Sequence, residues 1–150
     1  MDKTNESIFN DLYCSFLTAC EVNFKVHEID YVGKGISLND FYASSHWRTR
    51  HNIKTKFKPL FKELIREVLE FNKIDKFALI LEYNSKHDPD NVTGTEKLFV
   101  DALRVDKTGD GWIDDDSKKY YKLYAVKPND ELERNTFRFK IIDLGDGNKK

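Results

Sequence analysis

The 150-residue sequence predicts an α+β fold in which helices pack on a single mixed β-sheet. Two observations lead to this prediction: several short segments alternate apolar and polar residues, as strands do, and a long segment between them has helical period. The length suits one domain, since independent domains cluster near about 100–150 residues. No repeat or Gly/Ser/Pro-rich linker divides the chain, so we expect one domain over 1–150 with a frayed tail at 145–150.

The predicted elements alternate between strand and helix and finish with two strands. Alternating apolar residues indicate the strands, and apolar positions three or four residues apart indicate the helices. In chain order we expect a strand over 21–29, a short turn or helix over 38–42, a helix over 53–69, a strand over 77–83, a helix over 93–104, and strands over 119–126 and 136–142.

Two local features bear on where the helices begin. Pro59 falls inside the segment of helical period that starts at Ile53, so the helix either begins near this proline or is kinked there. Thr93 followed by Glu96 is a capping box, in which both side chains satisfy backbone donors at a helix start. We therefore expect the second helix to begin near Thr93.

The composition excludes several classes of protein. With 39% hydrophobic and 13% aromatic residues, the chain is neither disordered nor collagen-like. No apolar run approaches the about 18 residues of a membrane span, and no signal-peptide layout opens the chain, so we expect no membrane partner. Cys14 and Cys20 make no disulfide framework, which favours two reduced thiols and a cytoplasmic location.

Acidic residues gather next to two of the predicted strands. Asp88 and Asp90 follow one strand, and the run of Asp114, Asp115 and Asp116 precedes another. If these strands are neighbours, we expect the carboxylates to converge at one edge of the sheet, where close acids need a cation between them. Oxygen ligands select Mg²⁺, with Mn²⁺ as a substitute, and such an ion supports phosphodiester hydrolysis. The same spacing also fits solvated loop acids.

Lys97 lies near the start of the second predicted helix, on its polar side. A cation in this place could reach the phosphate in the transition state of a phosphodiester cleavage. The alternative is an exposed pair with Asp101, four residues further along the helix.

A segment rich in basic residues, the basic block, precedes the acidic residues at 88–116. From His46 to Arg66 the only acid is Glu63, and the block begins before the helix does. Interleaved Arg, Lys, His and Trp at the mouth of a helix suit contacts to a DNA backbone, although a solvated helix face would look similar. The candidate DNA-binding residues of this block are His46, Arg48, Arg50 and Lys54.

The acidic stretch also contains a segment that resembles an EF-hand calcium loop. Residues 106–117 place acids at positions 1, 5 and 9 and glycine at position 6. Thr108 departs from the pattern at position 3, and Ser117 replaces the bidentate Glu at position 12. A non-catalytic DNA-binding or calcium-binding module is therefore the alternative to an enzyme, and an ordinary Asp/Gly-rich loop is the simplest interpretation of this segment.

The ordered series of motifs resembles the signature of the RusA-type Holliday-junction resolvases. That family has an Asp-x-Asp-Asn, a lysine in the following helix, an Asp-Ala-Leu, an Asp-Asp pair ahead of a strand, and an upstream segment that contains an asparagine. The matching positions span residues 37–142: Asn39 within Ser37–Tyr42, then Asp88–Asn91, Lys97, Asp101–Leu103 and Trp112–Ser117. Residues 1–35 show no feature of the family.

This resemblance implies a RusA-like fold and a homodimeric, Mg²⁺-dependent endodeoxyribonuclease that resolves Holliday junctions or related branched DNA, without an organic cofactor. Asp88 and Asp90 match the first two metal-binding acids, Lys97 matches the catalytic lysine, and Asn39 joins the DNA-binding residues. Asp116 matches the third acid if the pair is Asp115–Asp116. Three consecutive aspartates, with Asp110 upstream, leave the third ligand open, and the five residues between Asn91 and Lys97 exceed the shortest family spacing.

Overall fold

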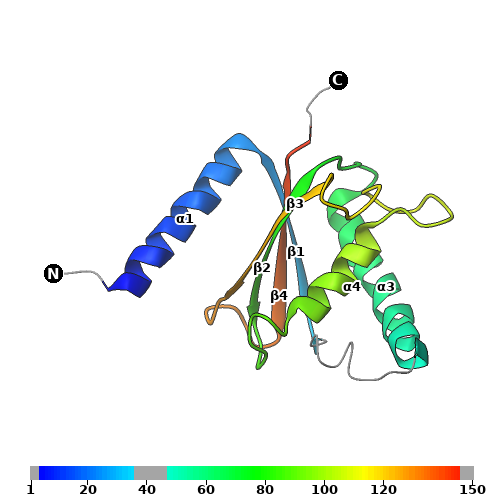
Figure 1. The fold of residues 1–150 in the computed structure, drawn as a ribbon, viewed down its shortest axis with the longest axis horizontal. Coiled ribbons are helices and arrows are strands. Elements are labelled where there is room, and N and C mark those ends of the chain that lie inside the picture. Colours follow the sequence, from blue (N-terminus) through cyan, green and yellow to red (C-terminus); the bar gives the residue numbers. More distant parts are fainter. Residues whose placement is uncertain (1–3, 36–46, 146–150) are drawn as a thin grey trace.

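A single four-stranded mixed sheet and three helices make up the described part of the computed structural model, residues 4–35 and 47–145. This is the predicted fold class. The elements run in the order α1 (Asn5–Asn23), β1 (Lys25–Val32), α3 (Trp47–Leu69), β2 (Phe77–Asn84), α4 (Thr93–Leu103), β3 (Tyr121–Pro128) and β4 (Thr136–Asp143) (Figure 1).

The last strand of the chain lies inside the sheet. The strand order is β1-β4-β2-β3, with β4 antiparallel to both of its neighbours and β3 parallel to β2 at an edge. Thr136, at the start of β4, aligns with Val32 on one side and with Asn84 on the other. The parallel pair β2 and β3 is joined through α4, because parallel neighbours need a crossover connection.

Helices α3 and α4 cover one side of the sheet, and the main core lies between them and the strands (Figure 1). As predicted, alternate residues of β2 and β4 point into this core, among them Leu79 and Phe139, both fully buried. Phe99 of α4 stacks on Phe139, with ring centroids 3.8 Å apart and planes 1° from parallel. This stacking fixes α4 over the middle of the sheet.

Helix α1 lies on the other side of the sheet and diverges from it toward the N-terminus (Figure 1). Cys20 packs with Ala78, Ile80 and Ile142 in a second, smaller core. Further along the helix, the Tyr13 hydroxyl donates a hydrogen bond of 2.6 Å to the Glu82 carboxylate. None of the helices in the described ranges is long and apolar enough to cross a bilayer.

The predicted strand over 21–29 is wrong at its start. Helix α1, capped where Ser7 N–H donates to Thr4 Oγ1 at 3.1 Å, continues to Asn23, so the strand begins only at Lys25. Its core-facing residues are His27, Ile29 and Tyr31, whereas Val22, from the expected alternation, is 77% exposed.

Other boundaries also differ from the predictions. Helix α3 begins at Trp47 and runs through Pro59, so the proline does not mark its start. Helix α4 does begin at Thr93, but Val92 is the N-cap residue and no side chain caps the helix, so there is no capping box. Strand β3 begins at Tyr121, two residues later than predicted. The segment 38–42 lies outside the described residues.

Candidate functional site

The first two acids of the motif lie in the turn that joins β2 to α4. The Tyr83 hydroxyl donates to the His87 carbonyl at 2.8 Å, and the Asp88 carbonyl accepts hydrogen bonds from the N–H groups of Asn91 and Val92 at 2.9 and 3.1 Å. The Asp88 and Asp90 side chains are exposed. Burial raises the pKa of Tyr83, and the negative charges of Asp88 and Asp90 raise it further.

Lys97 projects from the exposed side of α4, between two buried stretches of the same helix. The alternative pairing with Asp101 is not formed among the described side chains, because Asp101 instead lies 3.7 Å from Lys54 Nζ of α3. The side of α4 that carries Lys97 is therefore open to a ligand.

The third group of acids precedes β3, and its members have different surroundings. Asp115 lies 3.7 Å from Arg104. The backbone N–H of Asp116 donates to the Asp115 carboxylate and, together with Ser117 and Arg104, lowers the pKa of Asp115. Asp116 is exposed. Burial raises the pKa of Glu96 and of Tyr121, and the negative charge of Asp116 raises both further, so Asp116 lies near the first turn of α4 and the start of β3.

Glu96 is a buried acid that the sequence prediction treated only as part of a helix cap. It is 6% exposed and accepts a 2.8 Å hydrogen bond from the Tyr121 hydroxyl of β3. Burial raises the pKa of Glu96, while the bond from Tyr121 lowers it. Thr93 Oγ1 lies 3.4 Å from the hydroxyl of Tyr124, so two tyrosines of β3 contact the underside of α4. The sequence signal for this buried contact was the presence of Tyr121 and Tyr124 in the predicted strand that follows the helix.

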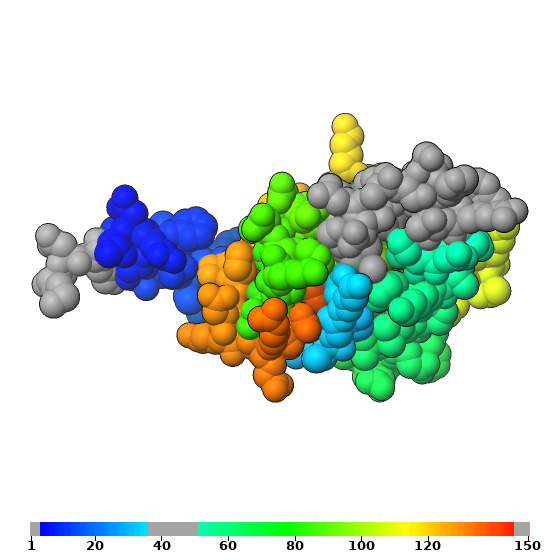
Figure 2. All heavy atoms as spheres, turned by 90° about the horizontal axis from the view of Figure 1, so that it is seen from below, coloured from blue at the N-terminus to red at the C-terminus, as the bar shows by residue number. Residues whose placement is uncertain are grey.

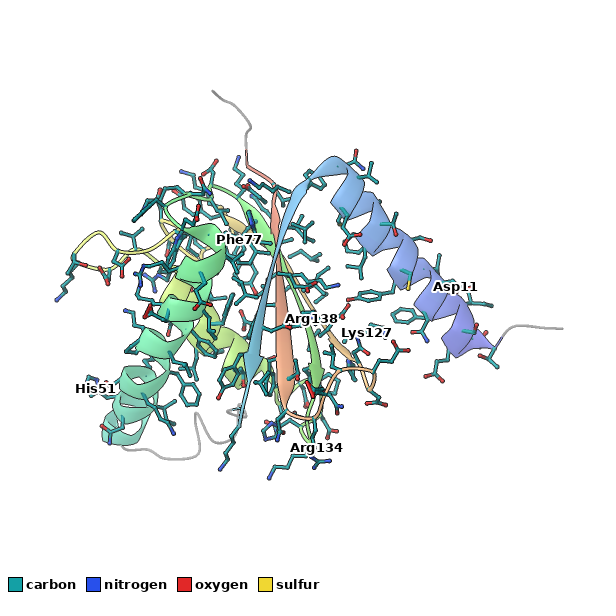
Figure 3. The ribbon with its side chains drawn as sticks, turned by 180° about the vertical axis from the view of Figure 1, so that it is seen from behind. Asp11, His51, Phe77, Lys127, Arg134 and Arg138 are labelled. Atoms are coloured by element: carbon teal, nitrogen blue, oxygen red, sulfur yellow. The ribbon has the colours of Figure 1, made fainter. Side chains whose placement is uncertain are left out.

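Strands β2 and β3 are neighbours, but their direction separates the two groups of acids. Phe77 aligns with Tyr121 and Tyr83 with Pro128, so β2 ends where β3 also ends. Asp88 and Asp90 follow that end, whereas Asp114 to Asp116 precede the opposite one, and the two ends of a strand of this length lie about 20 Å apart. Figure 3 shows the two ends of the sheet, marked by Phe77 and Arg134.

The expected convergence of the acids at one edge of the sheet is therefore not seen among the described residues. Within the described ranges, no three His, Cys, Asp or Glu side chains form a group that could hold a metal ion. The metal ligands remain a prediction.

Ion pairs connect the EF-hand-like loop to α3, and they use the acids that would bind calcium. Arg66 donates to both oxygens of Asp110 at 2.7 Å, and Lys62 Nζ lies 3.9 Å from Asp106. The Asp106 carboxylate accepts three hydrogen bonds from within the loop. A strand follows this loop where an EF-hand has its second helix. The loop is thus a structural connection between α4 and β3.

The basic residues of α3 line a cleft of about 690 Å³ between α3 and α4. Lys54 and Lys58 lie along it with Arg104, while Asp101 and Asp106 bring negative charge to the same cleft. Lys62, 7% exposed, donates to the carbonyl of Asp110 at 3.0 Å, and burial lowers its pKa. Arg48 and Arg50 fall in the first turn of α3, of which only the backbone is described; Asn39 and His46 lie outside the described residues.

Comparison of the chain with protein-family models and with curated proteins finds no match.

Proposed function

We propose that the chain is a metal-dependent endonuclease that acts on Holliday junctions or related branched DNA, as RusA-type resolvases do. The observation that best supports this proposal is that the motif residues lie on one strand–helix–strand unit, β2–α4–β3. Asp90, Lys97 and Asp116 are exposed, while the apolar residues between them, such as Phe99 and Leu103, are buried. The core thus fixes the backbone of the motif and leaves its charged groups available to a substrate.

The chemistry of the acids suits a hard divalent ion, but their geometry in one chain does not complete a site. Carboxylate oxygens of Asp88, Asp90 and Asp116 are ligands of the kind that Mg²⁺ and Mn²⁺ take. Such an ion, when bound, supplies an activated water and neutralises phosphate charge. In the proposed activity the chain supplies the carboxylates, and the ammonium of Lys97, which is exposed, would stabilise the phosphate oxygens.

We infer that a homodimer brings the two groups of acids together. Strand β3 forms an edge of the sheet, so a second chain can approach it. A two-fold axis beside β3 and perpendicular to the sheet reverses the direction of the strand in the second copy. The start of β3 in one chain, preceded by Asp116, then comes next to the end of the β2–β3 pair in the other, followed by Asp90. Such a dimer has two equivalent sites, which suits symmetric cutting of a four-way junction.

Nicking of a synthetic four-way junction tests the proposed activity. We expect nicking with Mg²⁺, none with a chelator, and far less on a linear duplex of the same sequence. Asp90→Asn should lower the nicking rate by orders of magnitude, whereas its affinity for the junction should be kept. Glu67→Gln, which removes one exposed negative charge from α3, is the matched control and should nick normally. Binding without nicking by the unaltered chain would indicate the non-catalytic DNA-binding alternative.

A mixing experiment tests the dimeric site. Asp90→Asn and Asp116→Asn chains are each expected to be inactive alone. If each site takes acids from both chains, a mixed dimer has one unaltered site, and nicking returns when the two variants are combined. If one chain carries the full site, the mixture stays inactive. Sedimentation of each variant shows whether dimers are present.

A further inference from the structure

Three loops meet at the end of the sheet where β1 and β2 finish and β4 begins. They come together because Thr136 aligns with both Val32 and Asn84. Between them lies a pocket of about 310 Å³, the three-loop pocket. Figure 2 looks onto this end, where light-blue, green and orange segments lie side by side. The polar side chains that line the pocket are those of Lys34, Ser85, Lys86, His87, Arg134 and Asn135.

Backbone hydrogen bonds hold the loops in place. Asn135 N–H donates to the Asn84 carbonyl at 2.6 Å, and the Asn135 carbonyl accepts from Gly33 N–H at 2.9 Å. Asn135 adopts a left-handed φ of 65°, which fixes a tight turn before β4. Gly35, at the pocket wall, has no room for a side chain, since a Cβ there would lie 2.4 Å from Phe137 Cζ. The pocket is therefore formed without a ligand.

The charged side chains that line the three-loop pocket among the described residues are all basic. Its described lining contains Lys34, Lys86 and Arg134 and no acidic residue. Like charges in one small pocket repel each other, and an anion among them removes this cost. The acidic neighbour of Arg134, Glu133, lines a different hollow together with Arg138.

His87 supplies a second sign of a ligand. It lines the pocket, and its Nδ1 is buried without a hydrogen-bond partner among the described residues. A buried polar atom without a partner costs free energy, so such atoms are uncommon in folded proteins. Because Nδ1 is buried, an oxyanion in the pocket gives it a partner once the ring turns so that a protonated Nδ1 faces the pocket.

We propose that the three-loop pocket binds one phosphate group. Arginine and lysine together suit a phosphate, which accepts a forked pair of bonds from a guanidinium and a strong point charge from an ammonium. The volume, at the low end of the about 300–1,000 Å³ of ligand pockets, suits a group of this size. The cleft between α3 and α4 is less suited, because Asp101 and Asp106 line it with the cations.

His87 directly precedes Asp88, so a phosphate in the pocket lies beside the proposed catalytic acids. Resting on the proposed function, the inference is that this phosphate belongs to the DNA backbone next to the cleaved bond. The pocket then holds the strand in position while the acids act on its neighbour.

Titration of ¹⁵N-labelled protein with inorganic phosphate tests the pocket itself. We expect saturable shifts of the amide signals of Lys34, Lys86 and Asn135. The shifts should disappear in Lys86→Ala/Arg134→Ala and persist in Lys25→Ala/Lys107→Ala, which removes two exposed charges elsewhere. Thermal melts show that each variant is folded, and Lys86→Gln with Arg134→Gln replaces the first pair if it is not. Absent shifts, or shifts equal in both variants, overturn the proposal.

The salt dependence of junction binding, with Ca²⁺ in place of Mg²⁺, tests whether the phosphate is that of DNA. Loss of one phosphate contact should reduce the slope of log K against log salt by about 0.9 in Lys86→Ala/Arg134→Ala, and by nothing in the control. Amide shifts with an unchanged slope overturn the DNA source and leave free phosphate as the ligand. Amide shifts in an unaltered chain that does not nick junctions refute the nuclease and keep the pocket.

Discussion

Asp106 holds together the loop that connects α4 to β3. Its carboxylate accepts hydrogen bonds from the Thr108 N–H at 2.9 Å, the Thr108 hydroxyl at 2.6 Å and the Asp110 N–H at 3.1 Å. The bond from the Thr108 hydroxyl is the largest cause that lowers the pKa of Asp106, which reaches about 2. The charged form of this side chain is thus the form that the folded protein prefers.

The stability of the protein should therefore depend on Asp106 in acid. Because the pKa is lower in the folded chain, the stabilisation is complete above the unfolded pKa of about 3.9 and is lost as the pH falls toward about 2. Asp106→Asn should lower the melting temperature at pH 6, and the difference from the unaltered protein should shrink between pH 4 and 2. A difference of the same size at pH 2 would contradict this account.

Glu96 is the opposite case, because its burial favours the neutral form and raises its pKa. The penalty for burying the charge is absent below the unfolded pKa of about 4.3 and is complete above the folded pKa. Glu96→Gln keeps an oxygen that accepts from Tyr121 and should raise the melting temperature at pH 7 but not at pH 4. An equal gain at both values would show that packing, and not charge, is responsible.

At the scale of the elements, strands with a strong pattern were predictable and the first helix was not. Phe137, Phe139 and Ile141 alternate with polar residues, and all three are buried in β4, so the predicted strand is confirmed. In α1 apolar residues do recur at helical spacing, as at Tyr13, Phe16 and Cys20, but only Cys20 is buried, so little packing accompanies the pattern. The last turn of α1 contains Val22, and because apolar and polar residues alternate from there into β1, this turn was predicted as the start of the strand.

The residues proposed for the candidate site were chosen from the sequence, and their roles stay a prediction, but their arrangement could not be predicted. Order along the chain put Asp88, Lys97 and Asp116 into one β–α–β unit, and the structure forms that unit. Which ends of the strands the acids follow or precede depends on the parallel register of β2 and β3, and that register is not written in the local sequence pattern. The three-loop pocket was not predictable, because Lys34, Lys86 and Arg134 come from loops that only the sheet order brings together.

Pro59 lowers the stability of α3 locally. The helix continues through it, so the backbone lacks one donor and the ring crowds the carbonyl of Thr55. Pro59→Ala should restore the hydrogen bond and increase the free energy of unfolding by up to about 3 kcal/mol. Urea unfolding measures the gain. A loss of stability instead would mean that the packing of α3 on the sheet depends on the bend.

At the scale of the whole molecule, α1 is joined to the rest by few contacts and keeps much apolar surface exposed. Phe9 and Leu12 are 62% and 64% exposed, while the Tyr13 hydroxyl reaches Glu82, and Lys127 Nζ lies 5.2 Å from the Tyr13 ring centroid. Figure 3 shows Lys127 on the side of the sheet that faces this helix. Tyr13 is thus the main polar contact between the helix and the sheet among the described residues.

Tyr13→Phe should loosen α1 without unfolding the sheet. A hydrogen bond to a charged group contributes about 1.5–3 kcal/mol, and we expect the low end because Asn129 and Lys140 still contact Glu82. Amide hydrogen exchange should become faster in α1 and stay unchanged in β2 and β4. Faster exchange throughout the sheet would mean that α1 and the sheet unfold as one unit.

The position of β4 inside the sheet also sets the order in which the chain can fold during its synthesis. Strand β1 waits for a partner about 100 residues further along the chain, which at about 5–20 residues per second takes on the order of 5–20 s. Until Thr136 to Asp143 emerge from the ribosome, β1 and β2 both expose an unpaired edge. Until then β1 has no strand partner, and the apolar residues of β2 on that edge are open to chaperones and to other chains.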